Sequence, residues 1–149
     1  MNATSQAEQT TDGWRDRIKA VMSNHSRLTR FGVLDRIRRM MHPPANPEDI
    51  QVARDAEFDL KRAELLSDDG VREFLLARRY LKQFAHRKSI NRRAHSYRLK
   101  HSAEAEGGAY VSNGALIAAA IDLGFAVKQI DQGPNCWLSL GKRLNEAAR

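Results

Sequence analysis

The sequence predicts a mainly α-helical fold with about five or six helices and a small C-terminal β-hairpin. Helix-start residues followed by apolar side chains at helical spacing recur along most of the chain. Near the C-terminus, two short runs typical of strands, at 125–130 and 136–140, flank the turn-rich segment 131–135. The 149 residues fit one domain. We therefore expect a flexible tail at 1–12 and a single domain at 13–149.

The first part of this domain, residues 13–88, is expected to be helical. Asp12 is a candidate N-cap for a first helix and Ser26 for a second. The prolines of His42-Pro43-Pro44 end the second helix, because a residue before proline disfavours the helical conformation. Its predicted apolar stripe consists of Leu28, Phe31, Leu34, Ile37 and Met41.

Asn46-Pro47 is the clearest helix start in the chain, since a capping side chain precedes a proline at the first helical position. A third helix is expected from there to about Leu66. The segment Ser67–Gly70 then provides a turn and a cap for a fourth helix, from about Asp69 to Lys88. The inward positions of the third helix are expected to be Ile50, Ala53, Ala56, Leu60 and Ala63.

Residues 89–101 are interpreted as a basic linker or arm, because this segment has few apolar residues. Residues 102–149 are interpreted as a helical part followed by the hairpin. Ser96 is a candidate N-cap for a helix that precedes the glycines at 107 and 108. Ser112 and Gly124 bracket a further helix that is apolar on nearly every side, so this helix is expected inside the core.

The order helix, turn, buried helix and β-hairpin over Ser96 to Leu140 is similar to the order of elements at the end of a winged-helix domain. The resemblance is one of element order and covers under a third of the chain. In a winged helix, the last helix before the hairpin reads the major groove of DNA. Here that helix is rich in Ala, Ile and Leu and offers no base-reading side chain, which departs from the pattern.

The net charge of +7 comes from one contiguous segment. Between Arg78 and His101 the chain has nine Lys or Arg residues, three His residues and no acidic residue, and the remainder of the chain sums to −2. Aromatic residues are interleaved with these cations. So concentrated a positive field is typical of a surface that meets phosphates.

These observations predict a small, non-enzymatic regulatory or accessory protein that binds the phosphate backbone of DNA or RNA. An interaction protein is the alternative, either an inhibitor or an adaptor, whose basic face docks on an acidic protein surface or a nucleoprotein complex. Pairing with the acidic third helix would instead neutralise part of the charge within the chain. The candidate contact residues are Arg78, Arg79, Lys82, Arg87, Lys88, Arg92, Arg93, Tyr97, Arg98 and Lys100.

Other functional classes have weaker support in the sequence. No nucleophile elbow, P-loop or dinucleotide fingerprint is present, so we expect no catalytic residues. The five His residues and the single Cys136 lack the paired spacing of a metal site, so we expect neither metal nor cofactor. No apolar run has the length of a membrane span and no signal peptide is evident, which together with the lone cysteine favours a cytoplasmic protein. The oligomeric state is left open.

Overall fold

The computed structural model describes residues 9–34 and 43–144. In these two ranges the chain is mainly helical with small antiparallel sheets, which confirms the fold class in this coarse form. The elements, in chain order, are α1 (Thr11–Ser23), β1 (Leu28–Thr29), β2 (Gly32–Val33), α2 (Pro47–Leu65), α3 (Asp68–Leu81), β3 (Phe84–His95), α4 (Ser96–Gly107), α5 (Asn113–Asp122), β4 (Val127–Gln129) and β5 (Cys136–Arg143).

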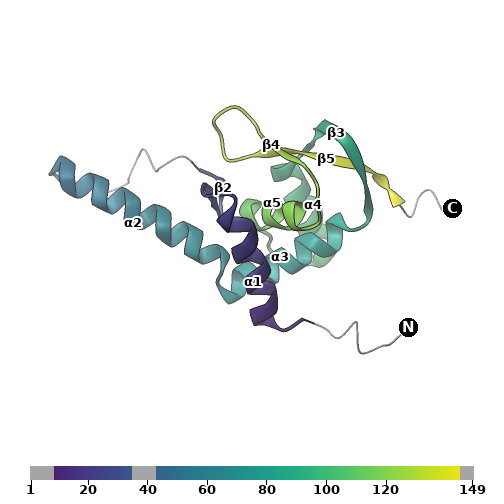
Figure 1. The fold of residues 1–149 in the computed structure, drawn as a ribbon, viewed down its shortest axis with the longest axis horizontal. Helices are drawn as coiled ribbons and strands as arrows, with labels where there is room; N and C mark the ends of the chain where they lie inside the picture. The colour runs from purple at the N-terminus through teal and green to yellow at the C-terminus, as the bar shows by residue number, and fades with distance from the viewer. Residues whose placement is uncertain (1–8, 35–42, 145–149) are drawn as a thin grey trace.

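Helix α5 forms the centre of the molecule (Figure 1). Every residue from 111 to 120 is buried, and α5 packs against α1, α3 and α4. The hydroxyl of Ser112 accepts a hydrogen bond from the N–H of Ala115, and Gly124 follows the helix with a φ of 91°. The predicted buried helix and both of its end signals are confirmed.

The C-terminal sheet has the strand order β3-β5-β4, with both pairs antiparallel. The predicted hairpin is thus confirmed as β4 and β5. The expected fourth helix, however, ends at Leu81 rather than at Lys88, and the linker predicted at 89–101 is instead the end of β3 and the start of α4. Strand β3 forms because β5 provides a pairing partner, and this tertiary pairing overrides the low apolar content of the segment.

A hairpin replaces the helix predicted from Ser26. Leu28 pairs with Val33 and Thr29 with Gly32. Gly32 has a φ of 119°, a conformation that interrupts a helix and that residues other than glycine rarely adopt. Two residues of the predicted stripe, Ile37 and Met41, lie outside the described residues.

Helix α2 extends away from the body of the protein (Figure 1). Leu65 is its one buried residue, whereas Leu60, expected to face inward, is 59% exposed. Ala56 and Ala63 are also exposed, so the predicted inward face is wrong over much of the helix. The C-terminal end of α2 is held by Arg62, whose guanidinium donates to the backbone carbonyls of Met22, His25 and Leu28 at 2.8–3.2 Å.

The predicted N-caps Asn46 and Ser112 are confirmed, since each side chain accepts a backbone N–H of the helix that it precedes. Within the predicted capping segment 67–70, it is Ser67 that caps α3. Two predicted caps are displaced by one or two residues. Thr10 caps α1 in place of Asp12, and His95 caps α4 in place of Ser96.

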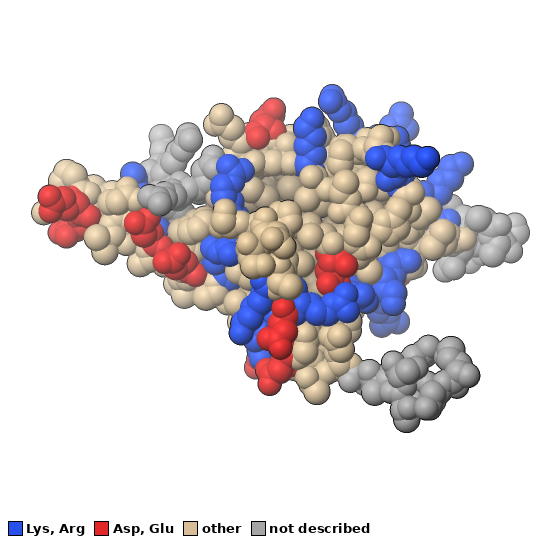
Figure 2. All heavy atoms as spheres, viewed as in Figure 1, with Lys and Arg blue, Asp and Glu red and all other residues tan. Residues whose placement is uncertain are grey.

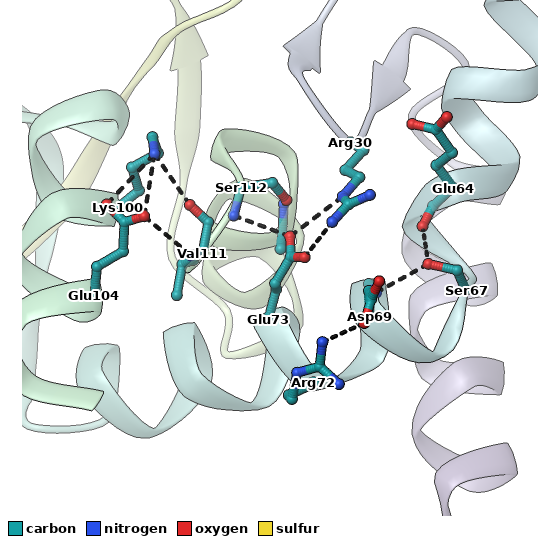
Figure 3. Close-up of polar contacts among 12 residues, drawn as sticks. Arg30, Glu64, Ser67, Asp69, Arg72, Glu73, Lys100, Glu104, Val111 and Ser112 are labelled. Carbon is teal, nitrogen blue, oxygen red and sulfur yellow. Dashed lines mark hydrogen bonds and ion pairs between the residues drawn. The ribbon is translucent and has the colours of Figure 1, made fainter. Parts of the chain in front are cut away.

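A buried carboxylate joins three of these elements (Figure 3). Glu73 of α3 is 2% exposed and pairs with the guanidinium of Arg30, at 2.5 Å between Arg30 Nη2 and Glu73 Oε2. Its Oε1 accepts the backbone N–H of Ser112 at 3.0 Å. The hairpin β1–β2, helix α3 and the start of α5 therefore meet at one side chain.

The hairpin and α5 also approach each other through their backbones. The N–H of Gly114 donates to the carbonyl of Arg30 at 2.8 Å. A Cβ at position 114 would lie 1.8 Å from the carbonyl oxygen of Thr29. Only glycine is compatible with this close approach.

We expect Gly114→Ala to lower the free energy of unfolding by about 3 kcal/mol or more, because the hairpin must move to admit the methyl group. Urea titration followed by circular dichroism measures the loss. Gly13→Ala in α1 is the control, since the nearest atom to its Cβ would lie at 3.4 Å and alanine favours a helix. Equal stability of the two variants would contradict the close approach at Gly114.

Replacement of Glu73 by Ala is expected to cost about 3–5 kcal/mol of unfolding free energy, because it leaves Arg30 and the N–H of Ser112 without their partner. Asp69→Ala is the matched control on the same helix, where the carboxylate is exposed and pairs with Arg72 (Figure 3). Its expected cost is under about 1 kcal/mol. Similar losses for both variants in chemical denaturation would argue against a structural role of Glu73.

Candidate nucleic-acid interface

Strand β3 bulges twice where its cations lie. His86 pairs with Leu140 and Asn91 with Leu138, so four residues of β3 stand opposite the single residue Ser139 of β5. Asn91 and His95 pair with the consecutive residues Leu138 and Trp137 of β5, so the three residues between them on β3 have no counterpart. The residues left out of the regular pairing include Arg87, Lys88, Arg92 and Arg93. Bulges turn side chains away from the regular pleat, so this strand presents cations that an even ladder would not.

Asn91 holds the strand between its two bulges. Its Nδ2 donates to the carbonyl of Leu140 at 2.9 Å, and its Oδ1 accepts the N–H of Arg93 at 3.0 Å. One amide side chain thereby joins β3 to β5 and shapes the backbone of the second bulge. Arg92 lies over the ring of Trp137, at 5.1 Å from its centroid.

The cations of β3 are exposed and have no carboxylate partner among the described residues. Arg79 and Lys82 at the end of α3 share this property, as does Arg98 on α4, so free cations flank both ends of the strand. Figure 2 shows Lys and Arg gathered over the part of the molecule that carries the sheet, whereas acidic side chains lie along α2. We define the basic surface by Arg79, Lys82, Arg87, Lys88, Arg92, Arg93 and Arg98.

Two predicted contact residues serve the fold instead. Arg78 pairs with Asp122, at 2.9 Å between Arg78 Nε and Asp122 Oδ2, and covers the ring of Trp14. Lys100 is 6% exposed, and its Nζ donates to the carbonyl of Val111 at 3.2 Å (Figure 3). Neither side chain is free to contact a phosphate, so we leave both out of the interface.

Tyr97 is 50% exposed and lies just beyond the end of β3. Its ring is 5.3 Å from the Nζ of Lys100 and meets His101 edge-on at 4.7 Å. Tyr80, the other tyrosine of the basic segment, is 6% exposed and belongs to the core.

Two cations of the sheet were not singled out by the sequence analysis. Lys128 of β4 and Lys142 of β5 are exposed and lack an acidic partner in the described ranges. Each is isolated in the sequence, and it is the pairing of β4 and β5 with β3 that brings them to the same sheet.

Glu104 on α4 is an acidic residue whose charge is already paired with other side chains. Burial opposes the ionisation of this carboxyl, but the hydrogen bond from Val111 and the contacts of Lys100 and His101 outweigh burial and hold its pKa below the ordinary value. Glu104 is therefore an ionised partner for Lys100 rather than a counter-charge for the basic surface.

The acidic helix α2 does not neutralise the basic surface either. No ion pair joins an acid of α2 to a cation of β3 in residues 9–34 and 43–144.

The same ranges contain no group of three or more His, Cys, Asp or Glu that could hold a metal ion, and no helix with the length and apolarity needed to cross a membrane. Burial raises the pKa of the Cys136 thiol to about 11, which opposes formation of the reactive thiolate.

Comparison of the chain with protein-family models, with curated proteins and with solved structures found no match.

The depressed pKa of Glu104 predicts a pH-dependent contribution to stability. The ionised carboxylate stabilises the folded protein above its ordinary pKa of 4.5, and this contribution is lost as the pH falls through the lower pKa of the folded state. We expect Glu104→Gln to be less stable than the parent at pH 7 and the difference to narrow below pH 4.5. Thermal unfolding of both proteins from about pH 7 to pH 3 tests this; a difference that stays constant would contradict it.

Proposed function

We propose that this chain is a non-enzymatic nucleic-acid-binding protein that contacts phosphates through the basic surface. The exposed and unpaired cations on the bulged part of β3 carry this proposal. Phosphates attract such cations and release condensed counterions when they bind, so binding is favoured without any base-specific contact.

Protection of a sheet edge explains only part of this surface. Strand β3 is an edge strand, and edges commonly carry charges and bulges that discourage pairing with other chains. Lys is the usual charged residue at such edges, whereas three of the four cations of β3 are Arg. A single sign of charge on adjacent positions is unfavourable unless a ligand of opposite charge offsets the repulsion.

We further propose that residues 84–143 are a winged-helix-like variant. The order α4-α5-β4-β5 supports this, as does the antiparallel pairing of the preceding strand β3 with β5. In this variant α5 is buried within the core and offers no exposed side chain for the major groove. The sheet would then carry the contacts, which fits recognition of the backbone rather than of base sequence.

Salt dependence tests the proposal. We expect the protein to bind random-sequence DNA, in duplex and in single-stranded form, with a steep loss of affinity as salt increases. Arg87→Ala/Lys88→Ala and Arg92→Ala/Arg93→Ala should each reduce the log–log slope on duplex by about 0.9 for every phosphate that the removed side chains had neutralised. Fluorescence anisotropy across a salt series measures these slopes.

The matched control is Lys19→Ala/Arg72→Ala, which also removes two exposed cations but from α1 and α3. Its slope should equal that of the parent protein. An unchanged slope in both β3 variants would show that another surface binds. No binding at low salt, with a protein partner that remains attached after nuclease treatment, would instead indicate the adaptor function.

A further inference from the structure

The exposed aromatic side chains lie around one pocket next to the basic surface. Three exposed large aromatic residues occur among the described residues, namely Phe31, Tyr97 and Tyr110, at 46%, 50% and 55% exposure. All three line the same pocket of about 270 Å³, which also includes Asn113 and Asn135. Exposed rings gathered at a single hollow indicate a binding site rather than scattered surface residues.

Asn113, which lines the pocket, is held rigidly by its hydrogen bonds. Asn113 is 6% exposed, and its Nδ2 donates to the carbonyls of Phe31 and Pro134 and to the Oδ1 of Asn135 at 3.0–3.3 Å. These three acceptors fix the orientation of the amide. Its Oδ1 then has no hydrogen-bond partner in the described part of the chain. This oxygen is enclosed by protein, so Asn113 shapes the wall of the pocket and offers it no free acceptor.

A cation lies between two of the rings. The Nζ of Lys100 is 5.3 Å from the ring centroid of Tyr97 and 4.8 Å from that of Tyr110. Its hydrogen bonds to Val111 and Glu104 fix the ammonium there. The pocket therefore combines aromatic rings with a fixed positive charge.

We propose that this pocket receives an unpaired nucleobase of a single-stranded nucleic acid whose phosphates lie on the basic surface; this rests on the proposed function. A base supplies a flat ring to stack on tyrosine, and its phosphates are attracted by the adjoining basic surface. A base in a duplex is already stacked and paired, so its ring does not reach such a pocket.

The basic surface and the aromatic pocket share neighbouring residues of the chain. Strand β3 ends at His95 and α4 begins at Ser96, so Tyr97 follows the bulged cations within one turn of helix. Arg98 is exposed on the same turn. Tyr97 is thus within a few residues of the cations on β3.

Binding of four probes tests the inference: a single-stranded oligonucleotide, its duplex, an abasic strand of the same length, and a nucleoside monophosphate. We expect the single strand to bind more tightly than the abasic strand at equal salt. Tyr97→Leu and Tyr110→Leu should each weaken the single strand by roughly 5- to 150-fold, the range for loss of one stacked base. The same variants should leave the duplex and the abasic strand unchanged.

Tyr97→Phe retains the ring and should bind as the parent does, and Leu60→Ala removes an exposed apolar side chain on α2 as the matched control. Equal affinity for normal and abasic strands, or insensitivity to both Tyr→Leu variants, overturns the base pocket while the proposed function stands. No binding to any of the three nucleic acids overturns both. Tight binding of the monophosphate without a preference for single strands assigns the pocket to a free nucleotide and overturns the single-strand inference.

Discussion

The buried carboxylate of Glu73 is the interaction on which the arrangement of the elements depends. It accepts hydrogen bonds from Arg30 of the hairpin and from the start of α5, so segments distant in the sequence meet at one group. A charge removed from water is tolerated only with its full set of partners. Because Gly114 admits the hairpin backbone directly beside this group, the hairpin covers α5 and completes its burial.

Burial of α5 limits where the proposed nucleic acid can be bound. A helix that is covered along its length stabilises the core and leaves no exposed side chain for a groove of DNA. In the proposed function the contacts come instead from the sheet and from the neighbouring parts of α3 and α4, and strand β5, which contributes Leu138 and Leu140 to the core, leaves β3 at the edge of the sheet. An edge strand paired on one side is free to bulge, and the bulges allow β3 to carry adjacent cations that a central strand would not accommodate.

Local signals in the sequence predicted the elements that local interactions determine. Ser112 and Gly124 marked the buried helix, and Asn46 and Ser67 marked the starts of α2 and α3. Strand β3 was missed because its bulges remove the alternation by which strands are recognised and because its partner β5 is distant in the sequence. Among the candidate site residues, the ion pair of Arg78 with Asp122 could not be predicted, because its partner is distant in the sequence. The ion pair of Lys100 could have been predicted, because Glu104 lies four residues further along the same helix.

The cations of the basic segment fall into two groups, those that pair with a carboxylate and those that do not. Arg78 pairs with Asp122, which Arg17 also contacts, and Lys100 pairs with Glu104, which His101 also contacts. The remaining cations on and beside β3 have one sign of charge and no carboxylate partner in the described chain. The ion pair of Lys100 with Glu104 has two effects. It removes Lys100 from the basic surface, and it fixes the ammonium near the rings of Tyr97 and Tyr110. The pairing that withdraws Lys100 from the basic surface thus also places its charge beside the aromatic rings, so the basic surface and the aromatic pocket result from the same packing.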